Sequence, residues 1–340
     1  MNWMWIFILS FAAGLAGTWM CRQIACRFQI IDKPDNTVKT HSRPVAYLGG
    51  VGILAGFAAG MVWVFLKGGR PAGGGWLLMA SAVICLVGLV DDIRPLLPRQ
   101  KIAGQVAAAA AAVFFLRPYL SGAFPSLPSW GAAAVSFGLL VFFVLGACNS
   151  VNLLDGLDGL CGGVTFFMCA GFFVLACLSG SAYSSFQAAM AVCLAGGTAG
   201  FLVFNYPPAV IFMGDAGSLL IGLILTCEMI LFLLEGPAAF LASLFIFGLP
   251  ILDTSVAILR RALNCRPLFA ADRGHIYDQF VDRGLSKTQS IWACYGLSVL
   301  FSAIGLFGYK IGLKWAVPLY LLTALVSFLL LWRQGFLKKI

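Results

Sequence analysis

Long uncharged stretches of apolar residues recur along nearly the whole chain, and they constrain its fold more than any other feature. Eleven of them approach or reach the roughly 20 residues that a helix needs to cross the hydrocarbon core of a bilayer. They lie near residues 3–20, 46–66, 73–90, 102–116, 130–148, 162–180, 185–204, 217–234, 238–259, 289–308 and 315–332. Since 61% of the residues are hydrophobic and only 10% are charged, the sequence predicts an all-α, polytopic membrane bundle. We expect a single domain over residues 1–340, without a soluble domain.

The distribution of basic residues predicts the orientation of these spans. If the N-terminus is outside, 17 of the 22 Lys and Arg residues fall in inner loops and the C-terminal tail. Cytoplasmic loops of membrane proteins carry such an excess. We therefore expect an outside N-terminus and a cytoplasmic C-terminus. The short, Ala-rich stretch 102–116 is needed for this count. Without it, every later span would cross in the opposite direction and the excess of basic residues on the inner side would be lost.

The loops expected on the inner face also carry most of the acidic residues. Asp91 and Asp92 end the third span, and Lys101 begins the fourth. Two adjacent carboxylates repel each other unless a cation lies beside them. On its own, this pair is more typical of a capped, solvated helix end than of a catalytic site.

A row of amide and carboxyl side chains follows the fifth span. Asn149, Asn152, Asp155 and Asp158 recur every three residues, so they would share one face of a continuing helix. Such a row of oxygens suits a hard cation such as Mg²⁺, or the N–H donors of a base edge. Helix capping would explain one or two of these residues but not all of them.

Two further loops on the same face carry polar motifs. Asp215 lies within "GDAGS" just before a span, where a helix N-terminus can bind phosphate. The loop 260–289 is rich in basic residues and contains Arg273 and His275. Such a loop can also contact lipid headgroups. Together, carboxylates for a metal ion and cationic groups for phosphate oxygens are the recurring equipment of phosphoryl transfer.

Six stretches of the chain resemble motifs of a known family. They are "KTHSRPVAYLGG", "VDDIRPLLPRQK", "NSVNLLDGLDGL", "FMGDAGS", "PILDTSVAILRR" and "DRGHIYDQFVDRGLS". In this order they resemble the polyprenyl-phosphate N-acetylhexosamine-1-phosphate transferases, membrane enzymes that start lipid-linked glycan synthesis. The resemblance implies an active site built from loops near 21–45, 91–101, 149–161, 205–217 and 260–289.

The resemblance also implies roles for individual residues. Asp215, assisted by Asn152, would bind Mg²⁺ or Mn²⁺. Catalytic roles toward the phosphates would belong to Asp91, Asp92, Lys101, Arg273 and His275. Substrate contacts would come from Asn149, Asp155, Asp158, Phe212 and His41, with Asp158 and Phe212 holding uracil. A lipid headgroup contact is an equal alternative for His41.

The implied reaction transfers a sugar phosphate from a cytosolic UDP-N-acetylhexosamine to undecaprenyl phosphate in the inner membrane of a bacterium. The product would initiate an O-antigen, capsule, teichoic acid or similar glycan, with N-acetylglucosamine as the first choice of sugar. Around His275 the sequence has one His where many relatives have three, which argues against the alternative MurNAc-pentapeptide transferase and leaves the sugar open.

A second alternative belongs to another class, a secondary transporter or flippase. It would account for Glu228, which lies inside a span and which we otherwise expect to pair with a polar neighbour. It would not explain why the motifs gather on one face. Membrane lipid is the expected surrounding, nucleic acid is not an expected partner, and a second copy of the chain is a candidate partner.

Overall fold

The computed structural model describes residues 2–32, 44–69, 73–120, 128–267 and 274–337. Helices dominate the described chain, and they run in the order α1 (Trp3–Arg27), α2 (Gly49–Val64), a π-helical turn η1 (Phe65–Gly69), α3 (Gly74–Ile93), α4 (Pro98–Leu120), α5 (Ser129–Leu153), α6 (Leu160–Ser179), α7 (Ser184–Asn205), α8 (Gly214–Glu235), α9 (Pro237–Ile246), α10 (Gly248–Leu263), α11 (Ile276–Asp282), α12 (Lys287–Ile311) and α13 (Leu313–Arg333). Two short strands, β1 (Ile31–Asp32) and β2 (Val45–Ala46), pair antiparallel between α1 and α2.

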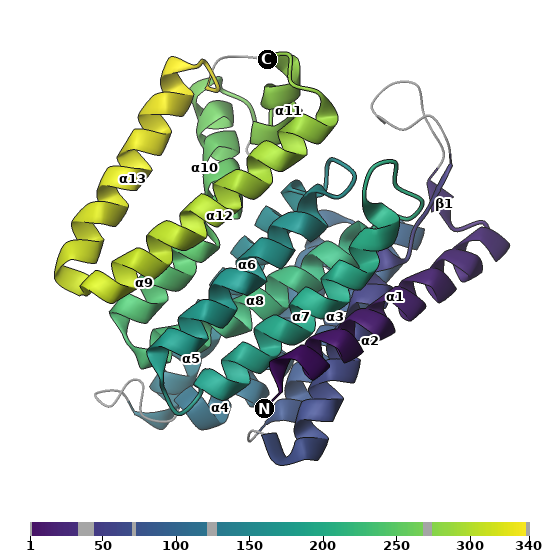
Figure 1. The fold of residues 1–340 in the computed structure, drawn as a ribbon, viewed down its shortest axis with the longest axis horizontal. Coiled ribbons are helices and arrows are strands. Elements are labelled where there is room, and N and C mark those ends of the chain that lie inside the picture. Colours follow the sequence, from purple (N-terminus) through teal and green to yellow (C-terminus); the bar gives the residue numbers. More distant parts are fainter. Residues whose placement is uncertain (1, 33–43, 70–72, 121–127, 268–273, 338–340) are drawn as a thin grey trace.

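Within the described ranges, ten helices are long and apolar enough to cross a membrane, and the bent pair α9–α10 brings the number to 11 if it is one span. These segments coincide with the eleven predicted stretches, so the prediction of an all-α, multi-pass membrane bundle is confirmed. The two termini lie at opposite ends of the bundle (Figure 1), as an odd number of crossings requires.

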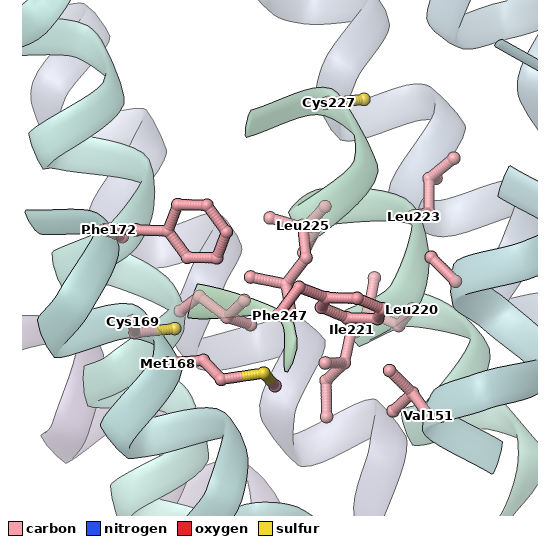
Figure 2. Packing of buried hydrophobic residues seen from close by; sticks show 14 of the residues in the cluster. Val151, Met168, Cys169, Phe172, Leu220, Ile221, Leu223, Leu225, Cys227 and Phe247 are labelled. Atoms are coloured by element: carbon pink, nitrogen blue, oxygen red, sulfur yellow. The ribbon is translucent and has the colours of Figure 1, made fainter. Parts of the chain in front are cut away.

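Helices α7 and α8 form the interior of the bundle, whereas α13 lies at its edge (Figure 1). Side chains of α6 and α8 pack there, together with Phe247 (Figure 2). Close approach between α1, α2 and α7 depends on glycine: a Cβ on Gly14 would lie 2.7 Å from the Gly197 oxygen, and one on Gly56 would lie 2.5 Å from the Gly197 Cα. Small residues allow such contacts where lipid offers no hydrophobic driving force.

The ninth span is broken, which differs from the single helix expected over 238–259. Helices α9 and α10 meet at Phe247 with a bend of 71°. Pro250 lies in the first turn of α10 and has no N–H to continue the hydrogen bonding of α9. The break redirects α10, so that Asp253 lies beside α11.

One end of the bundle carries the loops that matter for function. This end, called the loop face below, consists of β1, β2, residues 94–97, 154–159 and 206–213, and α11 with the end of α13. In Figure 1 it extends from α11 at the top of the view to β1 at the right.

Candidate functional site

Lys101 lies between two carboxylates at the centre of the loop face. Its Nζ is 3.2 Å from Asp91 Oδ2 and also contacts Asp215 Oδ2. The other oxygen of Asp91 accepts a 2.6 Å hydrogen bond from the Leu96 N–H. The three charged side chains are 14–21% exposed, so they are mostly enclosed but still reachable. The predicted need of the acidic pair for a neighbouring cation is therefore met by Lys101, which lies nine residues after Asp92 in the first turn of α4.

Asp92 caps the N-terminus of α8. Its two carboxylate oxygens accept hydrogen bonds from the N–H groups of Asp215 (2.8 Å) and Ala216 (3.1 Å). A carboxylate at this position satisfies free N–H groups and the positive end of the helix dipole. Gly214 makes the approach possible, since its φ is +65° and a Cβ there would lie 2.3 Å from Asp92. Asp92 thus holds the backbone of "GDAGS", while Asp91 faces Lys101.

Asn152, at the end of α5, holds the Asp215 side chain from another direction. Its Nδ2 donates to Asp215 Oδ1 at 2.6 Å and to Ser218 Oγ at 3.0 Å. Asp215 is therefore fixed by groups from α3, α4 and α5. Asn149 lies one turn earlier and donates to the Leu145 carbonyl at 2.7 Å.

The short hairpin β1–β2 positions Phe212. Ala46 forms a parallel bridge with Ile211, and the Phe212 N–H donates to the Ala46 carbonyl at 2.8 Å. The Phe212 carbonyl in turn accepts from the Gly49 N–H at 2.9 Å. The ring lies edge-on to Tyr47, with centroids 6.1 Å apart. Phe212 thus has a backbone fixed on both sides, next to the start of α8.

The loop between α5 and α6 brings two more carboxylates to this end. Asp158 Oδ2 accepts a 3.0 Å hydrogen bond from the Ala209 N–H, which joins this loop to the one before α8. Asp155 is half-buried. Burial, and the nearby carboxylates of Asp215, Asp92 and Asp158, raise the pKa of Asp155 above its usual range. A carboxyl in this setting gains from any cation that enters the site.

His275 is held by a carboxylate at the start of α11. Its Nδ1 lies 2.7 Å from Asp253 Oδ2, and Asp253 Oδ1 accepts a 2.7 Å bond from the Ile276 N–H. The imidazole stacks on the Tyr277 ring at 5.6 Å. The Tyr277 hydroxyl donates to the Leu153 carbonyl at 3.1 Å, so His275 is connected to the end of α5 that carries Asn152.

Comparisons with known proteins agree with this arrangement. A family model described as glycosyl transferase family 4 matches residues 75–233. The chain is 30% identical to the probable undecaprenyl-phosphate N-acetylglucosaminyl 1-phosphate transferase of Bacillus subtilis over 95% of this chain and 89% of the relative. The chain belongs to the polyprenyl-phosphate N-acetylhexosamine-1-phosphate transferase family.

Two further relatives of this transferase represent different branches. It is 30% identical to the decaprenyl-phosphate N-acetylglucosaminephosphotransferase of Mycobacterium leprae, over 85% of this chain and 78% of the relative. It is 33% identical to the phospho-N-acetylmuramoyl-pentapeptide-transferase of Desulforamulus reducens, over 77% of this chain and 81% of the relative.

The predicted site residues of the transferase fall into three groups. Contacts join one group at the start of α8: Asp91, Asp92, Lys101, Asn152 and Asp215. A second group lies around it in the adjoining loops and helix ends: Asn149, Asp155, Asp158, Phe212 and His275. Two residues, His41 and Arg273, lie outside the described residues.

Three residues that support the transferase site had no such role in the sequence-based prediction. Asp253 holds His275, and Tyr277 connects it to α5. Asn205 joins the two loops beside α8, since its Oδ1 accepts from the Gly159 N–H at 2.8 Å and its Nδ2 donates to the Ile211 carbonyl at 2.9 Å. Asp253 and Asn205 are polar residues near the ends of apolar spans, and that position was the available signal.

Glu228 does not have the polar partner that we expected. It is 1% exposed in α8, and neither carboxylate oxygen has a hydrogen-bond partner within the described part of the chain. It lies about four helical turns from Asp215, so it takes no part in the cluster on the loop face.

Proposed function

We propose that this protein transfers an N-acetylhexosamine 1-phosphate, foremost N-acetylglucosamine 1-phosphate, from its UDP-sugar to undecaprenyl phosphate. The reaction would take place at the cytoplasmic face of a bacterial inner membrane. An oxygen of the lipid phosphate attacks the phosphorus bonded to the sugar, the bond from that phosphorus to the UMP oxygen breaks, and UMP leaves. The lipid retains the sugar through a diphosphate.

The observation that carries this proposal is the ammonium group of Lys101 between Asp91 and Asp215 at the end of a membrane bundle. Three helices and a capped helix N-terminus fix these groups in advance. Phosphoryl transfer depends mainly on such positioning and on stabilising charge at the phosphate oxygens. The membrane location suits a substrate with a lipid tail and a phosphate head.

The residues present fit a divalent cation such as Mg²⁺. In the ranges that the structure describes, no three His, Cys, Asp or Glu side chains form a closed metal site. Mg²⁺ is usually held by one or two carboxylates together with substrate phosphates and water. Asp215 is the carboxylate best placed for this role, because Asn152 and Asp92 hold it from two sides. When bound, Mg²⁺ or Mn²⁺ supplies positive charge that neutralises the diphosphate.

Lys101 and Asp91 have complementary roles in this proposal. Lys101 contacts the carboxylates of Asp91 and Asp215, and its flexible side chain can turn to a phosphate oxygen of the reacting group. Asp91 is then free to orient the lipid phosphate or accept its proton. His275, held by Asp253, contacts the diphosphate or the sugar of the donor. In a rival scheme a carboxylate attacks first and forms a covalent phosphoenzyme.

A pocket in the bundle can receive the lipid tail of the acceptor. It has a volume of about 340 Å³ between α5, α8, α9 and α10, and its lining includes Phe142, Gly146 and Ser150. Phe142 is 70% exposed toward the surroundings of the bundle, so the pocket opens where lipid would lie. Ser150 lies two residues before Asn152, so the lining of the pocket extends to the end of α5 that carries Asn152.

The pocket gives a prediction with a matched control. Gly146→Leu fills space that no atom within 4 Å occupies, so it should raise the KM for undecaprenyl phosphate several-fold and leave the KM for the UDP-sugar unchanged. Gly138→Leu on the same helix also meets open space and lies outside this lining, so it should change neither. Equal effects of the two variants would contradict the pocket assignment.

The main test measures UMP release by the purified protein with undecaprenyl phosphate and a panel of UDP-N-acetylhexosamines. We expect release that requires Mg²⁺ or Mn²⁺ and is fastest with UDP-N-acetylglucosamine. Activity confined to UDP-MurNAc-pentapeptide would favour the peptidoglycan branch. No release with any donor would leave the transporter alternative standing.

Asp215→Asn tests the carboxylate at the centre of this proposal. It should lower the rate by about 10²-fold or more, because a neutral amide cannot balance the cations around it, while the amount of protein in the membrane stays unchanged. Incubation with labelled donor alone separates the two schemes: a labelled protein would favour the covalent route and overturn direct attack.

A further inference from the structure

The chain turns sharply after α13 and returns to the loop face. Gly335, with a φ of +79°, follows the helix, and its N–H donates to the Trp332 carbonyl while the Phe336 N–H donates to the Leu331 carbonyl, both at 2.9 Å. This pair of bonds is a Schellman motif, which ends a helix and reverses the chain. Residues 334–337, called the tail segment below, therefore leave the edge of the bundle and bond to side chains of α10 and α11 and to Asn264 just after α10.

Phe336 inserts between these helices. Its side chain is fully buried, at 0% exposed. The ring meets the Phe280 ring edge-on at a centroid distance of 6.0 Å, and the guanidinium of Arg283 covers it at 3.9 Å. Arg283 also donates through Nη2 to the Gln334 carbonyl at 2.9 Å. Burial of an aromatic ring with a cation on its face is a specific contact, because it needs both the socket and the turn before it.

The backbone of the tail segment is bound by the same side chains that hold the residue before His275. Gln279 Nε2 donates to the Phe336 carbonyl at 3.1 Å and to the Gly274 carbonyl at 2.8 Å. Arg260 Nη1 also reaches both carbonyls, at 3.5 Å and 2.5 Å. A Cβ on Gly274 would lie 2.3 Å from the Arg260 guanidinium carbon. Gln279 and Arg260 are 2% and 4% exposed, so these bonds are sheltered from water.

We propose that the tail segment is a positioning element of the active site, which fixes Gly274 through Gln279 and Arg260 and so sets the place of His275. The inference rests on the proposed function for its effect on catalysis, but the physical link does not. Asp253 holds the imidazole and the Ile276 N–H from one side. Gln279 and Arg260, which also bind the tail segment, donate to the preceding Gly274 carbonyl. A short displacement of this turn would move His275 relative to the donor.

The test compares Phe336→Ala with the conservative Phe336→Leu and with Trp332→Ala. Trp332 is 59% exposed on α13, so its loss removes a neighbouring aromatic ring without opening the socket. Phe336→Ala should lower kcat, up to about 100-fold. Its melting temperature should fall as well, because a fully buried ring is lost, so the rates are compared well below the unfolding transition. Phe336→Leu should recover most of the rate, and Trp332→Ala should change nothing. Equal losses in Phe336→Ala and Trp332→Ala would overturn the proposal.

A double variant, Phe336→Ala with His275→Ala, distinguishes a positioning role from a general loss of packing. If the tail segment acts through His275, Phe336→Ala added to His275→Ala lowers the rate no further. If the two losses multiply, the tail segment acts elsewhere and the proposal is wrong.

A readout that needs no turnover keeps the inference separate from the proposed function. The chain has two His residues, so modification by diethylpyrocarbonate can be followed peptide by peptide. His275 is 5% exposed, and it should react several-fold faster in Phe336→Ala than in the wild type or in Trp332→Ala. An unchanged rate of His275 modification in Phe336→Ala would refute the link even if the enzyme is active. A faster rate of modification would support the link even if the protein shows no activity with any UDP-sugar.

Discussion

Asp92 and Asp253 use their carboxylates in the same way, although they lie in different motifs. Each holds a backbone N–H with one oxygen, and each uses the second oxygen for another group at the start of a helix. Neither role can be read from a motif, because the partners lie more than twenty residues away. The sequence could predict that such carboxylates have partners, since unpaired carboxylates are costly inside a bilayer. The hydrogen-bond distances were needed to show that Asp92 and Asp253 position other groups.

The Asp253–His275 contact predicts a specific loss in Asp253→Asn. The amide keeps an acceptor for the Ile276 N–H but offers an N–H to His275 Nδ1, so the ring must turn or change its tautomer. The rate of UMP release should fall about tenfold or more, with little change in the melting temperature. Asp282→Asn, an exposed change at the end of α11, is the control. Normal activity in Asp253→Asn would remove Asp253 from the site.

At the scale of helices, the approach of α3 to α8 places Asp92 at the N-terminus of α8. A Cβ on Gly88 would lie 2.4 Å from the backbone of Asp215 and Ala216, so glycine is required at this crossing. The apolar pattern predicted both helices but not their distance. The break between α9 and α10 was missed for a related reason: hydropathy continues through it, and only Gly248 and Pro250 mark the bend.

This crossing predicts that Gly88→Ala separates the two helices, which lowers both activity and the melting temperature. Gly75→Ala on the same helix meets no atom within 4 Å. It should leave activity unchanged and can stabilise α3 by about 0.5–1 kcal/mol, because alanine loses less backbone entropy than glycine. Thermal melting in detergent and UMP release check both variants. If Gly88→Ala and Gly75→Ala had the same melting curve, the contact between α3 and α8 would accept a larger side chain at residue 88 than the structure implies.

At the scale of the whole molecule, the spans follow from local composition, which acts independently of tertiary contacts. The orientation stays a prediction from the same composition. The place of the tail segment does not follow from composition, because its partners are backbone carbonyls and a socket that exists only in the folded bundle. The sequence therefore predicted that the loops form the site. It did not predict that the segment after α13 is connected to His275.

The charge distribution predicts which face each loop occupies. In a background that replaces the exposed Cys26 and Cys177, a membrane-impermeant maleimide should label Lys314→Cys in intact cells. Cys265, exposed at the end of α10, should be labelled only after the membrane is permeabilised. The reverse pattern would invert the orientation and move the site to the outer face.

The turn at Gly335 also has a practical consequence for handling the enzyme. A purification handle or fluorescent fusion attached shortly after Leu337 would displace the C-terminal residues that bind α11. Low activity of such a preparation would then be attributed wrongly to the substrate. A handle placed before Trp3 would lie at the far end of the bundle and would not disturb these C-terminal residues.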